Sequence, residues 1–202
     1  EEVQNMSVVL PLVHELHSPS MRDRHWKQLS IITHKHFEKT PQFSLRDLLN
    51  LELHNCVEGV LELVEISVKE LKVEKKLRTI EDTWTTMELS FVRHKDTEVF
   101  IVGSPDEVLE QLEANQMDLQ TMASMGKFVD FFRDKVVVWQ THLSTVETVL
   151  KLMLTCQRGW TALEAIFLAS QDIRAQLPVH TKNFEGVDNE FKELMKDASV
   201  RP

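Results

Sequence analysis

The chain has 202 residues, a formal net charge of −9 and a hydrophobic fraction of 42%, as expected for an ordinary soluble protein. The negative charge opposes contact with phosphate backbones and anionic lipid, so we expect neither nucleic acid nor a membrane as partner. Five glycines and six prolines favour long helices over a turn-rich β-sandwich. The start of the chain does not resemble a signal peptide. It lacks an initiator methionine and both ends look cut mid-sequence, so we expect a piece of a larger protein.

The first quarter of the chain predicts two helices after a short apolar segment. The apolar segment, Val8–Leu16, is interrupted by Pro11. Ser18 followed by proline is a typical helix start, and Ser44 begins a variant of the capping box. We therefore expect helices over about 19–36 and 44–50.

A long helical period begins near residue 55 and predicts a helix over about 55–86. Glu65, Glu70 and Glu74 alternate with lysines, which is typical of a solvent-exposed face. The opposite face is apolar and should provide most of the stability. It consists of Val57, Val60, Leu61, Val64, Val68, Leu71, Leu77, Trp84 and Met87.

The period changes to two between Met87 and Val102. Alternating apolar residues there are followed by a polar turn, Arg93–Glu98, and by the β-rich run Val99–Val102. This pattern predicts an antiparallel hairpin over about 87–102. A lone hairpin is marginal in water, so we expect it to pack on the helices. Its polar turn is a candidate interaction surface.

The second half of the chain predicts three further helices, with the longest in the middle. Ser104-Pro105 opens the first, and Ser170 begins a short helical turn that stops at Leu177-Pro178. The middle helix contains no proline and would be ~60 Å long at ~1.5 Å per residue, which suits a part that transmits force or holds a spacing. We expect helices over about 105–125, 127–169 and 179–199. The apolar row of the longest is Phe128, Phe132, Val136, Trp139, Leu143, Val146, Leu150, Met153, Trp160, Leu163 and Phe167.

The resulting fold class is mainly α, an elongated bundle of long amphipathic helices with one small antiparallel β-hairpin. Trp26, Trp84, Trp139 and Trp160 fall at core positions of these helices, and we interpret them as core anchors. The alternative is that one of them closes a groove for a partner helix. The sequence does not choose between the two.

Motifs for chemistry are missing from the sequence. The histidines do not have zinc-ligand spacing, and neither a P-loop nor a GxGxxG motif occurs. Cys56 and Cys156 fall on apolar helical faces, which predicts buried free thiols in a reducing compartment. We expect no catalytic, cofactor-binding or metal-binding residue. An all-α enzyme built from distant acids and histidines stays open, because spacing would not show it.

Three ordered blocks of residues carry a family resemblance. Leu10–Val13 with Arg24–Leu29 forms the first block, and a helix from Ser67 to Leu77 followed by Trp84 forms the second. The third runs from Gln157 through Phe167 to Leu177-Pro178. With these blocks the chain resembles the linker region of dynein heavy chains, and the axonemal type more than the cytoplasmic. Ser67 in place of alanine, Met153-Leu154 in place of tryptophan and Gly159 in place of arginine depart from the family pattern and should loosen packing.

The resemblance implies that residues 1–202 are a fragment of the linker domain, a non-catalytic arm over the AAA+ ring. Such an arm bends and straightens with the ATPase cycle to produce microtubule-based ciliary movement. ATP and Mg would bind in the ring of the full-length motor, with no cofactor in this fragment. The motif residues with an implied structural role are Arg24, His25, Trp26, Glu74, Trp84, Gln157, Trp160, Leu163, Glu164 and Phe167.

The implied partners are the ring and tail of the same heavy chain, and intermediate and light chains through the tail. The implied location is the cytoplasm, the ciliary axoneme and the cytoskeleton. The alternative is a helical scaffold or interaction module of unrelated ancestry, for which equal helices without a hairpin would be typical.

Overall fold

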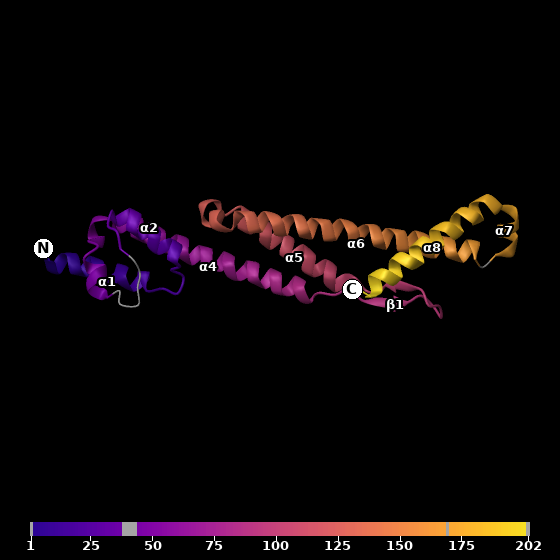
Figure 1. Cartoon of the computed structure of the whole chain (residues 1–202), viewed down its shortest axis with the longest axis horizontal. Coiled ribbons are helices and arrows are strands. Elements are labelled where there is room, and N and C mark those ends of the chain that lie inside the picture. The colour runs from indigo at the N-terminus through magenta and orange to yellow at the C-terminus, as the bar shows by residue number, and fades with distance from the viewer. Residues whose placement is uncertain (1, 38–43, 169, 201–202) are drawn as a thin grey trace. The chain divides into compact units, whose positions relative to one another are not determined.

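The computed structural model describes residues 2–37, 44–168 and 170–200, which are mainly α-helical with one two-stranded antiparallel sheet (Figure 1). The predicted fold class, mainly α with a small hairpin, is confirmed. The elements are α1 (Glu2–Leu16), α2 (Asp23–Thr33), α3 (Leu45–Leu49), the 3-10 helix η1 (Leu53–Asn55), α4 (Val57–Thr86), β1 (Phe91–Arg93), β2 (Phe100–Val102), α5 (Asp106–Ala123), the 3-10 helix η2 (Gly126–Phe132), α6 (Arg133–Phe167), α7 (Gln171–Gln176) and α8 (Pro178–Val200).

The chain divides into two compact units. The N-terminal unit consists of Glu1–Ile80 and Thr121–Val136, and the C-terminal unit of Glu81–Gln120 and Val137–Pro202. Each unit has a buried apolar core. That of the N-terminal unit includes Val9, Leu12, Leu16, Trp26, Leu29, Leu53, Val60 and Leu63. That of the C-terminal unit includes Val102, Trp160, Phe184, Phe191 and Met195.

Helix α1 lies in a segment for which the sequence predicts no helix, since Pro11 interrupts its apolar run. Pro11 instead lies inside the helix. Val9, Leu12 and Leu16 are buried, and their spacing of three and four residues places them on one helical face. Burial of this face in the core outweighs the missing amide of the proline.

The expected helix over 19–36 is wrong at both ends. Ser18 lies in a turn, and its hydroxyl contacts the hydroxyl of Ser20 at 2.9 Å rather than capping a helix. Helix α2 begins at Asp23 and ends where His34 adopts a left-handed conformation, with φ of 53°. The capping box at Ser44, in contrast, is confirmed, since its side chain accepts from the Asp47 amide.

The buried face of α4 differs from the apolar face that the sequence predicted. Leu61 and Val68 were expected inside but are exposed, whereas Ser67 and Glu70 are buried. A buried carboxylate is tolerated only where charged or hydrogen-bonding partners surround it. The partners of Glu70 are Arg24 and His25 of α2, and Ser67 is bound by Ser20 in the turn before α2. The period of α4 alone could not show them.

The long helix predicted over 127–169 is shorter and begins later. Gly126 has φ of 60°, a conformation that glycine adopts without strain, and it is the first residue of the 3-10 helix η2. Val129 and Phe132 of η2 are both buried, as the three-residue period of a 3-10 helix requires. Helix α6 then runs for 35 residues, about 52 Å. Ala169 lies outside the described residues.

The apolar row of α6 is only partly buried. Leu143, Leu150 and Trp160 are buried, but Val146 and Leu163 are exposed. The four tryptophans divide in the same way: Trp26 and Trp160 are buried, and Trp84 and Trp139 are half-buried. The interpretation of all four as core anchors is therefore too simple.

The hairpin is shorter than the predicted 87–102 and packs within the C-terminal unit. Strands β1 and β2 pair Phe91 with Val102 and Arg93 with Phe100. Helix α8 contacts β2 and returns from α7 toward the hairpin (Figure 1). The expectation that the hairpin packs on helices is confirmed.

Candidate functional site

The first concentration of motif residues lies in the N-terminal unit, around the carboxylate of Glu70. One of its oxygens, Oε2, accepts from Arg24 Nε at 2.7 Å and lies 3.0 Å from His25 Nε2. Arginine and histidine are neighbours on α2, and the glutamate comes from α4. We call Ser20, Arg24, His25, Ser67 and Glu70 the Glu70 cluster.

The histidine of this cluster is held in one tautomer. The backbone N–H of Arg22 donates to His25 Nδ1 at 3.0 Å, so in the neutral ring the proton is on Nε2, which donates to Glu70. Burial lowers the pKa of His25 from its ordinary value, against the opposing effect of Glu70. A neutral histidine on α2 therefore donates a hydrogen bond to the carboxylate of Glu70 on α4.

Two serine hydroxyls extend the cluster. Ser20 Oγ and Ser67 Oγ lie 2.8 Å apart, and Ser67 Oγ donates to the Val64 carbonyl at 2.8 Å. Because Ser67 is fully buried, its hydroxyl needs these partners. The serine that departs from the family pattern thus adds a polar link.

The other motif residues of this unit flank the cluster. The Arg24 guanidinium lies 3.9 Å from the centre of the Phe131 ring, a cation–π contact with η2. Trp26 packs edge-on against Phe37 at a ring separation of 6.4 Å. Glu74 accepts from Arg22 at 3.1 Å in a half-exposed pair.

The second concentration lies in the C-terminal unit, around the carboxylate of Glu164 on α6. Its Oε2 accepts from Lys95 Nζ at 2.7 Å and lies 3.3 Å from His94 Nε2. The hydrogen bond from Lys95 is the main reason that the pKa of Glu164 lies below its ordinary value. The His94 ring also packs edge-on against Trp160, at 4.9 Å between ring centres.

Gln157, one helical turn before Trp160, binds the backbone of the edge strand β2. Its Oε1 accepts from the Val102 N–H at 2.8 Å, and its Nε2 donates to the Val102 carbonyl at 3.0 Å. The side-chain amide thus takes the place of a neighbouring strand and satisfies both backbone groups of a buried residue. We call Gln157, Trp160 and Glu164 with His94 and Lys95 the hairpin clasp.

Trp160 also joins α6 to α8. Its Nε1 donates to Asp188 Oδ1 at 2.9 Å, and its ring stacks on Phe191 at 4.6 Å. The second oxygen of Asp188 accepts from Lys192 Nζ at 2.6 Å. A further stacked pair, Phe167 with Phe184, lies 5.4 Å apart. In contrast, Leu163 is exposed.

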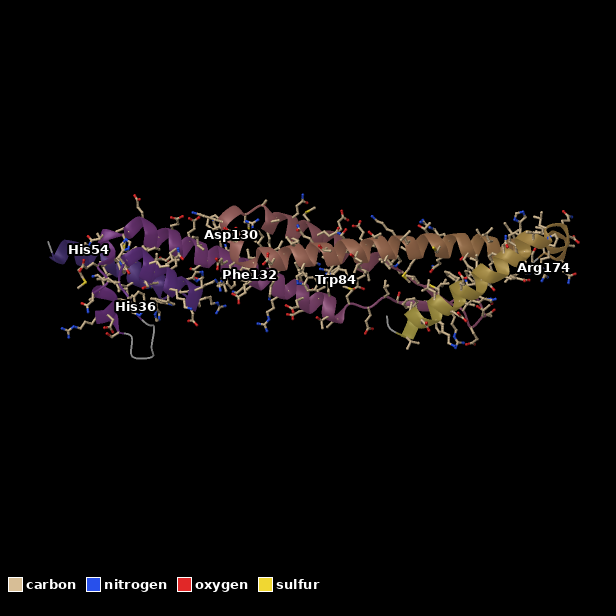
Figure 2. The ribbon with its side chains drawn as sticks, turned by 45° about the horizontal axis from the view of Figure 1, so that its top comes forward. His36, His54, Trp84, Asp130, Phe132 and Arg174 are labelled. Carbon is tan, nitrogen blue, oxygen red and sulfur yellow. The ribbon has the colours of Figure 1, made fainter. Side chains whose placement is uncertain are left out.

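Trp84, at the C-terminal end of α4 (Figure 2), belongs to neither cluster. It lines an open, almost wholly apolar groove of about 310 Å³ in the C-terminal unit, with Val108 and Val149 on other walls. Its Nε1 is buried without a hydrogen-bond partner within the described ranges. The structure thus places this motif residue at a groove rather than in a core.

The chemistry of these groups is that of structural contacts. The carboxylates of Glu70, Glu164 and Asp188 are all engaged by cations or N–H donors. Burial raises the pKa of the Cys56 thiol, which disfavours the reactive thiolate. Cys156 is exposed and Cys56 half-buried, so the expectation of two buried thiols is wrong.

A metal site also lacks support in the part of the chain that the structure describes, where no three His, Cys, Asp or Glu side chains gather to hold an ion. Figure 2 shows His36 and His54 at separate places in the N-terminal unit. Among the same residues, none of the helices has the length and hydropathy needed to cross a bilayer.

Several residues of the clusters were not singled out from the sequence. His94 and Lys95 lie in the turn that we expected to be an exposed surface, but His94 is buried and Lys95 binds Glu164. Asp188 and Ser20 were also missed. A buried histidine in a polar hairpin turn gives no signal in the sequence, because its partner is 70 residues away.

Fold and clusters together define a mainly helical segment whose polar residues join one element to another. The model of the family "Dynein heavy chain, N-terminal region 2" matches residues 1–202. The chain is 43% identical over 200 residues to dynein axonemal heavy chain 17 of Mus musculus, and 42% identical over 201 residues to the dynein beta chain of the flagellar outer arm of Chlamydomonas reinhardtii. It is 42% identical over 200 residues to dynein axonemal heavy chain 9 of Homo sapiens.

These matches cover 98–99% of this chain and 4% of each relative. The chain therefore belongs to the dynein heavy chain family and spans about 4% of the length of the curated relatives that it matches. The resemblance to axonemal dynein heavy chains that the three sequence blocks predicted is confirmed.

Proposed function

We propose that this chain is a mechanical, non-catalytic segment of the linker of an axonemal dynein heavy chain. In this proposal the linker is an arm over the AAA+ ring, and it bends and straightens with the ATPase cycle to drive ciliary movement along microtubules. ATP and Mg bind in the ring, outside these 202 residues. Family membership over the whole chain supports the proposal.

The observation that carries the mechanical role is the hairpin clasp. Gln157, Trp160 and Glu164 lie on one long helix and bind respectively a strand, a second helix and a hairpin turn. An element that transmits force must not slip relative to its neighbours, and directional hydrogen bonds fix the position of one element on another more strictly than apolar contacts alone.

The partners and location follow from the same proposal. The segment acts with the ring and tail of its own heavy chain, and intermediate and light chains reach it through the tail. Its place is the ciliary axoneme within the cytoplasm and cytoskeleton, as the names of the relatives suggest. The alternative of a scaffold of unrelated ancestry is excluded by the family match.

The proposal is tested in the heavy chain that contains this region. Gln157→Met removes both hydrogen bonds to β2 while keeping the size of the side chain. We expect microtubule gliding to slow while ATP hydrolysis by the isolated motor stays near the parent value. Gln120→Met, on the exposed surface of α5, is the matched control and should leave both unchanged.

Two results would contradict this role. One is an equal loss of hydrolysis and gliding in Gln157→Met, which would indicate damage to the ring rather than to force transmission. The other is binding of ATP to residues 1–202 at micromolar affinity, measured by calorimetry.

A further inference from the structure

A second, exposed row of residues runs along α6 beside its buried row. Its members are spaced alternately by four and three residues from Val138 to Ile166, and all are exposed. This spacing is the 3.5-residue period of a helix that packs lengthwise on another helix. We call it the 138–166 seam. It consists of Val138, His142, Thr145, Val149, Leu152, Cys156, Gly159, Leu163 and Ile166.

Beside the seam lies a second exposed row, its outer flank, which consists of Thr141, Thr148, Thr155 and Ala162. Neither the seam nor this flank contains an acid, a lysine or an arginine. Solvated helix faces normally carry such charges, as α5 does with Glu107, Glu110 and Glu113. Five seam residues are large, exposed apolar side chains, among them Leu152 at 60% and Val149 at 49% exposure, and an uncharged face that carries such a row marks an interaction site.

The threonine hydroxyls of this face already have hydrogen-bond acceptors within α6. Thr141, Thr145, Thr148 and Thr155 each donate their hydroxyl to the carbonyl four residues earlier in α6. A buried hydroxyl is costly when its donor is unpaired, and these donors are already paired within the helix. A partner could therefore cover all four without leaving a donor unsatisfied.

The shape of the seam fits the side chains of a second helix. Gly159 has open space where a Cβ would stand, and Cys156 and Ala162 nearby are small, which leaves holes for larger side chains. At the other end, Thr145 and Val149 of the seam also line the groove beside Trp84. That groove is apolar and open, so it would accept bulky side chains from the same helix.

We propose that an amphipathic α-helix from another part of the same heavy chain covers the 138–166 seam. The relatives of this chain are far longer than the 4% that it matches, and a heavy chain of such length has room for this helix outside residues 1–202. The seam and its flank comprise 13 residues, fewer than the roughly 20–30 residues per side of a stable interface between separate proteins. A tethered helix needs less contact, because its effective concentration is high.

A second copy of the chain is the less suitable occupant. Each copy carries a net charge of −9, which opposes the approach of two copies, and the uncharged seam offers no compensating ion pairs. The proposed helix on the seam depends on membership of the dynein heavy chain family and not on the proposed mechanical role. If the mechanical role were disproved, the proposal for the seam would still stand.

The exposed thiol of Cys156 allows a direct test in the full-length heavy chain. We would measure the rate at which N-ethylmaleimide modifies Cys156 under native conditions, by mass spectrometry of the peptide. The control is a thiol introduced by Ala165→Cys, exposed on the same helix in the row of Lys151 and Arg158, which lies outside the seam and its flank. We expect Cys156 to react at least about tenfold more slowly than the control, as for a group protected by packing. Equal rates would overturn the inference.

The source of the covering helix is tested by crosslinking. A short reagent that joins the Cys156 thiol to a nearby amine is applied to the native heavy chain, and the joined peptide is sequenced. We expect a peptide from the same heavy chain, outside residues 1–202, with an apolar seven-residue repeat. A peptide from another protein, or one from residues 1–202 of a second copy, would overturn the assignment to the same chain.

Discussion

The Glu70 cluster and the hairpin clasp use the same groups, a carboxylate with a histidine and a longer cation, but bury them differently. The side chains of Glu70 and Arg24 are 8% and 27% exposed, whereas those of Glu164 and Lys95 are 15% and 57% exposed. A cation in water is readily solvated when its partner is removed, and a buried one is not. The same pairing should therefore contribute more to stability in the N-terminal unit.

The aromatic contacts have the opposite distribution. Trp160 in the C-terminal unit is stacked, hydrogen-bonded and touched by a histidine, whereas Trp26 packs edge-on against Phe37. The N-terminal unit thus combines an apolar core with a buried ionic group. The C-terminal unit centres on one indole ring that several elements share.

The largest effect should come from Trp160→Ala. Loss of the ring leaves a cavity between α6, α8 and the hairpin and should lower the free energy of unfolding by about 3–5 kcal/mol. Trp139→Ala, on the same helix but half-buried, is the control and should cost about 1 kcal/mol. Urea unfolding measures both, and equal costs would show that the buried position of Trp160 has been misjudged.

The stabilities contributed by the two carboxylates are compared by replacing each glutamate with glutamine. Glu70→Gln removes the charge that balances Arg24 and should cost about 3 kcal/mol. Glu164→Gln should cost about 1 kcal/mol, because Lys95 can turn into water. Both are measured by urea unfolding at pH 7. A larger cost for Glu164→Gln would reverse the proposed ranking of the two units.

Gln157→Met removes the hydrogen bonds of the hairpin clasp to β2 and leaves its other contacts in place. Two backbone groups of Val102 would lose their partners, at a cost of about 2 kcal/mol. Hydrogen exchange at the Val102 amide should accelerate strongly, while exchange in α2 should stay unchanged. Unaltered exchange at Val102 would mean that Gln157 does not hold the strand.

The smallest effect should be a difference in pH dependence. The pKa of His25 is lowered from 6.5, so the folded state binds protons less readily and stability falls as the pH drops from about 6.5 toward the lowered pKa. The pKa of Glu164 is lowered from 4.5, so its contribution is complete above pH 4.5 and falls only at lower pH.

Of these two contributions, therefore, that of His25 should change between pH 7.5 and 5.5 and that of Glu164 should not; the change is at most about 1.4 kcal/mol for each unit that the pKa of His25 is displaced. Urea unfolding of the parent and of His25→Gln over this range measures it. The stability of the variant should depend less on pH than that of the parent. Parallel pH profiles would contradict the assignment of a neutral His25.

Local sequence signals determined much of the architecture. The periods of 3.6 and 2 located α4, α5, α6, α8 and the hairpin, and the capping residues Ser44 and Ser170 begin helices as expected. These signals act within a few residues of one another, so the sequence contains them in readable form. The three family blocks likewise indicated the family, which the family model over residues 1–202 confirmed.

Tertiary contacts decided the rest. Pro11 is tolerated because the α1 face is buried, and Glu70 faces inward because Arg24 and His25, 45 residues or more away, reach it. Lys95 likewise meets Glu164 across 69 residues. The free energy of burying a charge depends on partners that the fold brings together, and spacing along the chain does not record them.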